Sequence, residues 1–438
     1  MASLPVLTSN QPVASCMHPY HQQTVHTWES IRHGGAMDWS RQPSVFKHYP
    51  NKFPVIPLDQ LPELKDFFQL SAGLTARKVY PGGEYYLRVN PSAGALYPCE
   101  LYIQARDVQG LEDGIYHFEP QQFCLRLLYS LDENEGLEAC CPDKRRISGL
   151  VLLISTIYYR SSWKYRSRAL RYCLLDSGHL LGAVESAAWC TGRPFQVQYL
   201  LDRNKVADSF GFKNRELVMA MAVSGQRQET VVQEFSMELS FVDGSGHHRT
   251  DSLIEKSYAD CSSLTGCSAV EEQGNLWSAS TGELTKAIIE RRSIREFTGT
   301  SMSMDEYATI LHAAQESVIS DCDQQIRVWS VINRVDGLQQ GLYNGLTCIR
   351  RGDLSNFAGY LCLEQSLGSD SGVTFFVSSE DDNYLSLMQK AGIIGQRIYL
   401  AATMQGLGCS GIGAFYDDEV AEFLQTDEMI LYALAVGY

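Results

Sequence analysis

The sequence predicts a duplicated fold in which each half combines strands with helices. Three observations support this prediction: a repeated strand–turn–strand unit, a pair of matching amphipathic helices, and an apolar strand at the end of each half. The unit V-Q-G-L-E-D-G-I-Y at residues 108–116 matches V-D-G-L-Q-Q-G-L-Y at residues 335–343, and each follows an alternating apolar run typical of a strand. The closing segments, ELVMAMAVSG and MILYALAVGY, have the apolar character of buried strands.

The two matching helices are predicted at residues 174–193 and 387–408, each with glycine near its end. Their small residues keep one offset of 214 positions (392 − 178 = 214), which relates Gly178 to Gly392, Ala187 to Ala401, Ala188 to Ala402 and Gly192 to Gly406. A constant offset over a whole helix is hard to obtain by chance, so we infer an internal duplication. One chain would then do the work of two subunits.

The composition places the chain among globular proteins with small partners. The 438 residues are 45% hydrophobic and 11% aromatic, which excludes a disordered or fibrous chain and allows roughly two or three domains. The formal charge of −15 argues against a general binder of nucleic acid or of an anionic membrane. Small molecules or peptides are therefore the expected partners.

Targeting and cysteine patterns predict a cytoplasmic protein. The 13 cysteines include no CxxC pair and no Cys/His pair at metal spacing, as expected in a reducing compartment. No Lys or Arg precedes Arg32, and the N-terminal segment has no continuous apolar core, so we do not interpret it as a signal. The longest apolar run, residues 149–157, is too short to cross a bilayer.

Residues 226–281 are predicted to form a linker, because much of this segment is rich in Ser, Gly and Asp and poor in periodic apolar residues. The expected domains are residues 1–225 and 282–438. His247 and His248 lie in the linker without a third metal ligand nearby, so a solvated loop is the expected structure.

One candidate site for a phosphate is R-R-S-I-R, which contributes Arg291, Arg292, Ser293 and Arg295 directly after the helical pattern LTKAIIE. Guanidinium groups bind phosphate in a bidentate manner, and the chain is otherwise acidic. An ordinary basic helix C-terminus is the alternative, and on these residues alone we favour it.

Residues 406–413 contain a literal GxGxxG, but the glycines end a predicted helix, whereas a dinucleotide site must follow a strand and open a helix. A Rossmann site is therefore rejected. A C-cap turn remains, or a stretch where bare backbone approaches a flat ligand closely.

Two further segments carry candidate groups. P-S-A-G-A-L at residues 91–96 is a rigid turn that either faces a ligand or simply connects to the next strand. Lys164 and Tyr165 are proton-transfer candidates if burial or a cation lowers a pKa, and otherwise belong to a solvated basic loop.

His117 and His179 are interpreted as core residues, and the acid pairs at 381–382 and 417–418 as helix N-terminal charges, so hydrolysis is not expected.

Taken together, these segments resemble the nitroreductase-like FMN flavoproteins. The first half is similar to the SagB-type dehydrogenase branch, the azoline (thiazoline/oxazoline) oxidases of peptide modification, in YHQQTVHTWESIR, PSVFKHYP, RVNPSAGALYPCELY, GLEDGIYHF and YYRSSWKYRSRALRYCLLDSGHLLG. The second half resembles a generic member in ERRSIREF and AGIIGQRIYLAATMQGLGCSGIGAF. The resemblance implies an α+β fold: two mixed sheets flanked by helices, with the halves swapped against each other as an intrachain pseudo-dimer.

The resemblance also implies an FMN site and its residues. Arg291, Arg292, Ser293 and Arg295 correspond to the family's segment for the phosphate and ribityl chain, and Lys164 and Tyr165 to the catalytic pair of the azoline oxidases. The remaining correspondences are Ile412, Gly413 and Ala414 near flavin N5 and O4, Gln365 at the pyrimidine edge, and Pro91, Ser92, Ala93, Gly94, Ala95 and Leu96 from the opposite half.

One FMN per chain is expected. The first half lacks an RRS segment and has R-P-F-Q at residues 193–196 where GIG would fall, and the second half has a degenerate segment, 316–327, in place of the PSAGALYP turn. After the final strand the sequence lacks the basic residues that help many nitroreductases bind phosphate. Weaker flavin affinity, or compensation by Arg88 or Lys47, is the expected consequence.

Three functions remain open. The first is oxidation of azoline rings on a ribosomally made peptide, with oxygen as the final acceptor and a cyclodehydratase as a partner. The second is reduction of nitro compounds or quinones by NAD(P)H, for which the Lys-Tyr pair would be dispensable. The third is a flavin-free scaffold in a peptide-modification complex.

Overall fold

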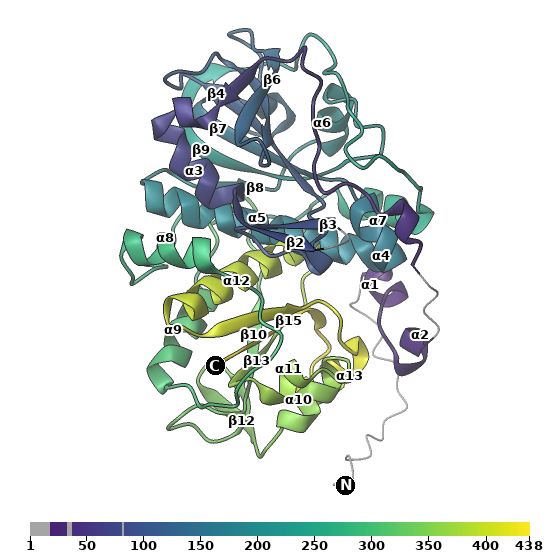
Figure 1. The fold of residues 1–438 in the computed structure, drawn as a ribbon, viewed down its shortest axis with the longest axis vertical. Helices are drawn as coiled ribbons and strands as arrows, with labels where there is room; N and C mark the ends of the chain where they lie inside the picture. The colour runs from purple at the N-terminus through teal and green to yellow at the C-terminus, as the bar shows by residue number, and fades with distance from the viewer. Residues whose placement is uncertain (1–17, 33–36, 81–82) are drawn as a thin grey trace.

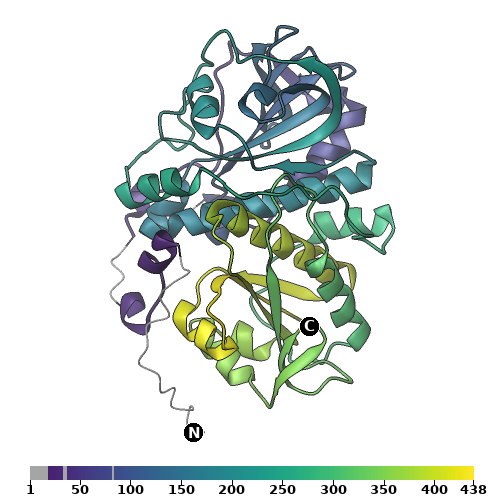
Figure 2. The same ribbon diagram turned by 180° about the vertical axis from the view of Figure 1, so that it is seen from behind.

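The computed structural model describes residues 18–32, 37–80 and 83–438. Two β-sheets lie at opposite ends of the molecule, and two long helices, α5 (Ala169–Thr191) and α12 (Tyr384–Met404), cross between them (Figure 1). Seen from behind, the same two helices again separate the sheets (Figure 2). The layers are therefore sheet, helices, sheet.

The first sheet, within the described residues, has seven strands in the order β1-β6-β5-β4-β7-β9-β8. In chain order they are β1 (Val55–Pro57), β4 (Cys99–Arg106), β5 (Gly114–Glu119), β6 (Cys124–Ser130), β7 (Arg145–Thr156), β8 (Gln196–Gln198) and β9 (Leu217–Val231). A separate hairpin pairs β2 (Leu74–Tyr80) with β3 (Gly83–Arg88).

The second sheet repeats this topology. Its order is β12-β11-β10-β13-β15-β14, which corresponds strand by strand to β6-β5-β4-β7-β9-β8 of the first sheet. The strands are β10 (Arg327–Ile332), β11 (Gly341–Asn344), β12 (Thr347–Arg351), β13 (Val373–Ser379), β14 (Gly408–Ile412) and β15 (Met429–Gly437). The predicted strand–turn–strand units are β4–β5 and β10–β11, and the predicted closing strands are β9 and β15.

The strands of both sheets pair antiparallel, for example β4 with β7 and β13 with β15. Parallel pairing in the described residues is confined to isolated bridges, one of which joins Ser293 to Cys409. The mixed character expected of the sheets is therefore limited to such bridges. The Ser293–Cys409 bridge matters for the site, because it lays the R-R-S-I-R segment against β14.

Shorter helices cover the long pair. α3 (Pro62–Ala72) packs on α5, α9 (Met304–Gln315) packs on α12, and α8 (Thr281–Glu290) contacts both long helices. The N-termini of α8 and α9 both form capping boxes, Ser280 with Glu283 and Ser303 with Glu306. The other helices are α1 (Pro19–Gln23), α2 (Trp28–Arg32), α4 (Tyr159–Tyr165), α6 (Arg203–Ser209), α7 (Ser252–Cys261), α10 (Ser355–Leu361), α11 (Ser366–Asp370) and α13 (Asp417–Leu424).

The two halves exchange segments. Near the N-terminus, the His18 backbone amide reaches Met429 Sδ at 3.5 Å and His21 Nδ1 lies 3.3 Å from the Tyr384 hydroxyl, both in the second half. In the opposite direction, Arg291 donates to the carbonyl of Val89 at 2.7 Å. Each half is therefore completed by the other.

The segment expected to be a linker contains regular structure. β9 continues into it as far as Val231, and α7 packs against both long helices. Val270 then pairs with Ser320, and a disulfide joins Cys267 to Cys322. From the cysteine spacing we expected reduced thiols and did not predict this disulfide. Its partners are 55 positions apart, and no short motif links them. The boundaries 1–225, 226–281 and 282–438 remain a proposal.

No helix in the described ranges combines the length and apolar character that crossing a membrane requires. Residues 1–17 of the N-terminal segment, which we did not interpret as a signal, lie outside the described residues.

Candidate functional site

The turn at residues 91–96 lies between β3 and β4 and is held by Asp176 on α5. Asp176 accepts hydrogen bonds from Ser92 Oγ at 2.6 Å and from the Ala93 amide at 3.2 Å. Gly94 and Ala95 follow with φ values of +65° and +54°, a left-handed conformation that glycine adopts without strain. The turn is thereby fixed in a conformation that leaves Gly94 exposed.

Asp176 is buried, and it forms no ion pair with any residue that the structure describes. Burial raises its pKa to about 7, although the bonds from Ser92 and from the Ala93 amide oppose this shift. The sequence analysis did not single out this residue. The available signal was an isolated carboxylate within the otherwise apolar pattern of α5.

Lys164 and Tyr165 end α4 and lie directly over this turn. A Cβ added at Gly94 would lie 2.8 Å from Tyr165 Oη and 3.0 Å from Lys164 Nζ. The structure therefore brings two sequence-predicted groups, the turn and the Lys-Tyr pair, into contact. Burial raises the pKa of Tyr165, with smaller upward contributions from Tyr172 and Asp176 and a downward one from Arg295. Tyr165 therefore keeps its proton at neutral pH, and the lowered pKa considered from the sequence does not apply to it.

Arg291 connects the second half to the end of β3. Its Nε donates to the Val89 carbonyl at 2.7 Å and its Nη2 to the Arg88 carbonyl at 3.3 Å. The guanidinium lies 5.2 Å from the centre of the Tyr399 ring, and Nη1 is buried without a hydrogen-bond partner among the described residues. An unpartnered buried donor is costly, so Nη1 is a ready donor for a ligand.

The segment after Arg291 runs beside β14. Ser293 Oγ lies 2.8 Å from the Tyr399 hydroxyl, which accepts a 2.6 Å bond from the Gly411 amide. Arg295 Nη1 donates to Ser410 Oγ at 3.4 Å. Residues 408–412 thus form an edge strand rather than the helix end expected from the sequence, because α12 stops at Met404 and Gly406, at φ +76°, turns the chain.

The loop that follows β14 approaches the first half. A Cβ at Gly413 would lie 2.5 Å from Cε1 of Tyr172, and Arg168 Nη2 donates to the Gly413 carbonyl at 3.2 Å. The ring of Tyr172 lies 4.2 Å from that of Tyr165. A continuous series of contacts therefore runs from Gly94 through Tyr165 and Tyr172 to Gly413. Ile412 is buried in the core of the second half, and Ala414 is half-buried beside Gly413.

These residues fit a phosphorylated flat ligand such as FMN. Within the described ranges, none of Arg291, Arg292 and Arg295 forms an ion pair with a carboxylate, in a chain of net charge −15. Arg292 donates to the carbonyls of Ile289 and Thr75 and is half-buried, while Arg295 is exposed. Unpaired guanidinium groups are suited to a phosphate dianion, and glycine at 94 and 413 lets backbone approach a ring.

Lys47 and Arg88 were expected to compensate for the basic residues that are missing after the final strand, and both have partners within the first half. Lys47 is buried in an ion pair with Glu216 and donates to the Tyr102 hydroxyl at 2.7 Å. Arg88 Nη2 donates to the Val45 carbonyl at 2.8 Å. The charge of Lys47 is therefore already paired. Arg88 forms no ion pair with a carboxylate among the described residues, and its Nε is buried without a hydrogen-bond partner there, so compensation by Arg88 stays an expectation.

Gln365 is the least supported member of the expected set. It precedes α11, and its Nε2 donates to the carbonyl of Cys362 at 2.8 Å. The contacts recorded for it in the described residues are local, and they do not join it to the Arg291 segment or to Gly413.

Asp417 has a larger role than the helix N-terminal charge expected from the sequence. It begins α13 but is 2% exposed, and it pairs with Arg168 and Arg171 from the first half. Burial alone would raise its pKa, but Arg171 and Arg168 together hold the pKa well below its usual range. The sequence could not reveal these two ion pairs, because Asp417 is about 250 positions away from both arginines.

The two histidines expected in the core are there. His179 is buried, with Nε2 2.9 Å from the Tyr432 hydroxyl, and His117 is buried against Glu100 at 2.8 Å. His248, expected in a solvated loop, lies partly against the rings of Tyr158 and Tyr159. The described residues contain no group of three or more potential metal ligands.

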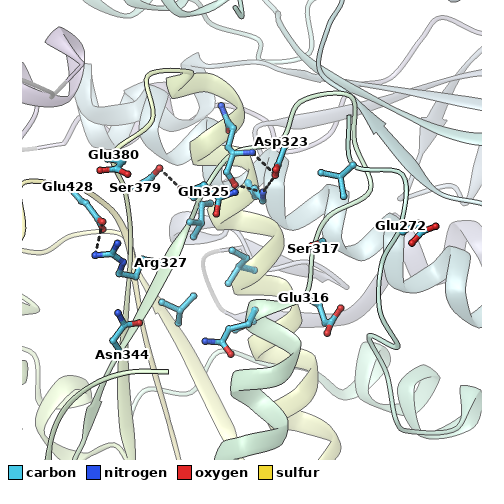
Figure 3. Close-up of a pocket in the computed structure, with 18 of the residues that line it drawn as sticks. Glu272, Glu316, Ser317, Asp323, Gln325, Arg327, Asn344, Ser379, Glu380 and Glu428 are labelled. Carbon is cyan, nitrogen blue, oxygen red and sulfur yellow. Dashed lines mark hydrogen bonds and ion pairs between the residues drawn. The ribbon is translucent and has the colours of Figure 1, made fainter. Parts of the chain in front are cut away.

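The pseudo-symmetric counterpart of this site is an acidic cavity of about 760 Å³ (Figure 3). It lies along α12, where Lys390 occupies the position equivalent to Asp176 (390 − 176 = 214). Lys390 donates to the Gln324 carbonyl at 2.5 Å and reaches Asp323 at 3.4 Å, so the charge that holds the turn is reversed. The carboxylates around the cavity are those of Glu271, Glu272, Glu316, Asp323, Glu380 and Glu428.

The segment after α7 also contributes to this cavity, since Val270 pairs with Ser320 and residues 269–272 line one side. Arg327, a guanidinium at the cavity, is paired with Glu428 at 3.0 Å. Negative charge and a paired arginine disfavour a phosphate here. The two pseudo-equivalent positions therefore differ in their suitability for a phosphate group.

Comparisons with known proteins agree with this fold. Residues 288–438 match the family model described as Nitroreductase family. The whole chain is similar to the crystal structure of a protein classed as a nitroreductase from Anabaena variabilis ATCC 29413, with a TM-score of 0.76, 26% sequence identity, and coverage of 95% of this chain and 98% of that chain. The chain thus has the nitroreductase-like α+β fold, as predicted.

Two proteins with local sequence similarity to this chain have names that state a role. The trifolitoxin-processing protein TfxB of Rhizobium leguminosarum bv. trifolii is 27% identical over 128 residues, which are 28% of this chain and 34% of that protein. The FMN reductase (NADPH) of Bacillus subtilis strain 168 is 27% identical over 164 residues, which are 35% of this chain and 64% of that protein. The chain spans 34–64% of the lengths of the curated relatives that it matches.

Proposed function

We propose that this protein is an FMN-dependent oxidoreductase that dehydrogenates azoline rings to azoles on a ribosomally made peptide. The observation that carries the proposal is the contact of Lys164 Nζ and Tyr165 Oη with Gly94, in the turn expected to face the cofactor. The similarity to a toxin-processing protein supports a peptide substrate, and the similarity to an FMN reductase supports the cofactor.

The residues proposed to hold FMN come from both halves. Arg291, Arg292 and Arg295 would bind the phosphate, with Ser293 beside them. The backbone of residues 412–414 would approach the ring from the second half and residues 91–96 from the first, and Gln365 is retained for the pyrimidine edge. We propose one such site per chain, because the equivalent cavity is acidic.

The proposed chemistry divides between cofactor and chain. Oxidation of an azoline removes a hydride and a proton from the ring, and bound FMN would supply the acceptor for the hydride. Lys164 Nζ would take the proton when it is in its neutral amine form. Tyr165, which keeps its own proton, would donate a hydrogen bond that orients the substrate or Lys164. Asp176 would act indirectly by fixing the turn that faces these groups.

Replacement of Lys164 tests the proposal. Lys164→Ala is expected to retain the flavin absorption of the wild type and to oxidise thiazoline peptides at least about 100-fold more slowly, as for loss of a general base. Lys286→Ala, at an exposed lysine on α8, is the matched control and should react normally. Unchanged turnover in Lys164→Ala would contradict the assigned role.

A second function is favoured by one observation: the part that matches the family model, residues 288–438, contains the whole arginine segment but not the Lys-Tyr pair. A reductase that takes hydride from NAD(P)H would not need the Lys-Tyr pair. Rapid bleaching of the flavin by NAD(P)H, in a protein indifferent to thiazoline peptides, would select this alternative. A protein that takes up no flavin would select a scaffold, and a cyclodehydratase is the partner proposed in either peptide-modifying role.

A further inference from the structure

A cavity of about 430 Å³ opens beside the Lys-Tyr pair. Its lining includes Gly94, Ala95 and Leu96 of the turn together with Lys164. The same cavity therefore contains the backbone expected to face the cofactor and the proposed base. A group bound here lies next to the reacting centre.

Its lining includes five aromatic residues: Trp39, Phe46, Tyr85, Tyr86 and Trp163. Two contacts between them are edge-to-face, Trp39 with Trp163 at 5.4 Å and Phe46 with Tyr86 at 5.0 Å between ring centres. Trp163 Nε1 also donates to the Asp38 carbonyl at 2.9 Å. These contacts hold the rings in position, so the walls are shaped before a ligand binds.

The ring of Trp39 is unusually exposed although it contacts Trp163. Trp39 is 62% exposed, although tryptophan is among the side chains that gain most from burial. Trp39 lies at the cavity, on a wall continuous with the proposed catalytic centre. A ligand bound in the cavity would cover its exposed ring.

The aromatic wall also contains a carboxylate, and that carboxylate is already paired. Glu84, the carboxylate in the lining, is engaged by Arg77 Nε at 3.0 Å and by the Tyr86 hydroxyl at 2.6 Å. The hairpin of β2 and β3 thus neutralises its own acid while presenting the ring of Tyr86. Rings and a paired carboxylate favour an apolar group over a charged one.

We propose that this cavity binds an aromatic or large aliphatic side chain of the substrate peptide, contributed by the residue next to the ring that is oxidised. The inference rests on the proposed function and deepens it. Trp39, Phe46 and Tyr86 are specificity-determining residues in this view, and Trp163 holds Trp39 in place.

Binding of unreactive product analogues tests the inference without turnover. The probes are acetyl-X-thiazole-glycine amides with X = Phe, Leu, Gly or Glu, titrated by calorimetry into the FMN-loaded protein. The Phe and Leu probes are expected to bind about tenfold more tightly than the Gly and Glu probes, the ratio that burial of one large apolar side chain produces.

Variants separate this cavity from general effects. Trp39→Ala and Phe46→Ala should each reduce the preference to about twofold or less. Trp28→Ala removes another exposed tryptophan, 46% exposed on α2, and should leave the preference unchanged. Equal affinity for the four probes, no binding of any probe, or a preference that survives in both cavity variants would overturn the inference.

The same four sequences with thiazoline in place of thiazole distinguish the two proposals. Oxidation without any preference among them would overturn the cavity assignment and keep the azoline reaction. A binding preference without oxidation of any thiazoline would overturn the reaction, and the cavity would still be assigned to an apolar side chain.

Discussion

Gly178 and Gly392 meet where α5 crosses α12. A Cβ added at either residue would lie 2.8 Å from the Cα of the other, closer than real Cβ contacts allow. The two positions are equivalent in the duplication, since they differ by 214. The pseudo-two-fold axis therefore passes through this contact, and the glycines set how closely the halves approach.

Alanine at Gly178 or Gly392 is expected to destabilise the protein by about 1–3 kcal/mol, because the nearest obstacles are backbone atoms that cannot rotate away. Urea unfolding measures the change. Gly282→Ala is the control: it lies in α8 with open space around the new Cβ, and its stability should equal or slightly exceed that of the wild type. A tolerated alanine at both positions would contradict the proposed crossing.

Asp417→Asn is expected to lower the free energy of unfolding by about 3–5 kcal/mol, because it leaves the buried guanidiniums of Arg168 and Arg171 without a counter-charge. Asp418→Asn, at the exposed neighbour, serves as the control and should have a small effect.

The pH dependence of the Asp417 effect has a definite sign. The folded-state pKa of Asp417 is lowered, so its contribution is present above its ordinary pKa of 3.8 and is lost as the pH falls through and below that value. The stability difference between wild type and Asp417→Asn should therefore shrink on acidification. A difference that is constant from pH 7 to pH 3 would contradict the ion-pair assignment.

Asp176 is expected to show the opposite behaviour. Its folded-state pKa is raised to about 7, so the stability it contributes is full below its ordinary pKa of 3.8 and is lost as the pH rises to about 7. Asp176→Asn should gain stability relative to wild type over that interval, by up to about 4 kcal/mol. Thermal unfolding at a series of pH values measures this, and a pH-independent difference would show that the carboxyl is not buried as described.

The arginine segment is expected to set FMN affinity. Arg292→Gln and Arg295→Gln should each weaken FMN binding by about tenfold or more, as for loss of a charge-assisted hydrogen bond. Arg193→Gln is the matched control, because Arg193 lies in the first half, where it donates to the Glu63 carbonyl at 3.1 Å. Fluorescence titration of the apoprotein gives the three dissociation constants, and equal values for all variants would exclude these arginines from the phosphate site.

The fold was predictable because its strongest signals are local or periodic. The offset of 214, the repeated turn units and the apolar closing strands each need only short windows of sequence, and the strand orders agree with them. The helix boundaries and the β14 strand were less predictable, because residues 406–413 are glycine-rich and their conformation depends on pairing with β15.

The site was predictable in its segments and not in the residues that hold them. The turn, the Lys-Tyr pair and the arginines carry recognisable patterns, whereas Asp176, Tyr172 and Tyr399 act through contacts with residues far away in sequence. Arg291 illustrates the difference: its type suggested a phosphate, but its bonds to residues 88 and 89 of the other half appear only in the folded chain.

The central claim is a single composite flavin site between the halves, and the most direct test is the FMN content of the full chain. The protein is saturated with FMN, freed of excess, denatured, and its released flavin is measured by absorbance against chain concentration. The account predicts one FMN per chain, and Arg295→Gln should fall below that value at limiting FMN. Two FMN per chain would show that the acidic counterpart is also a flavin site, and none would remove the flavin from the proposed function.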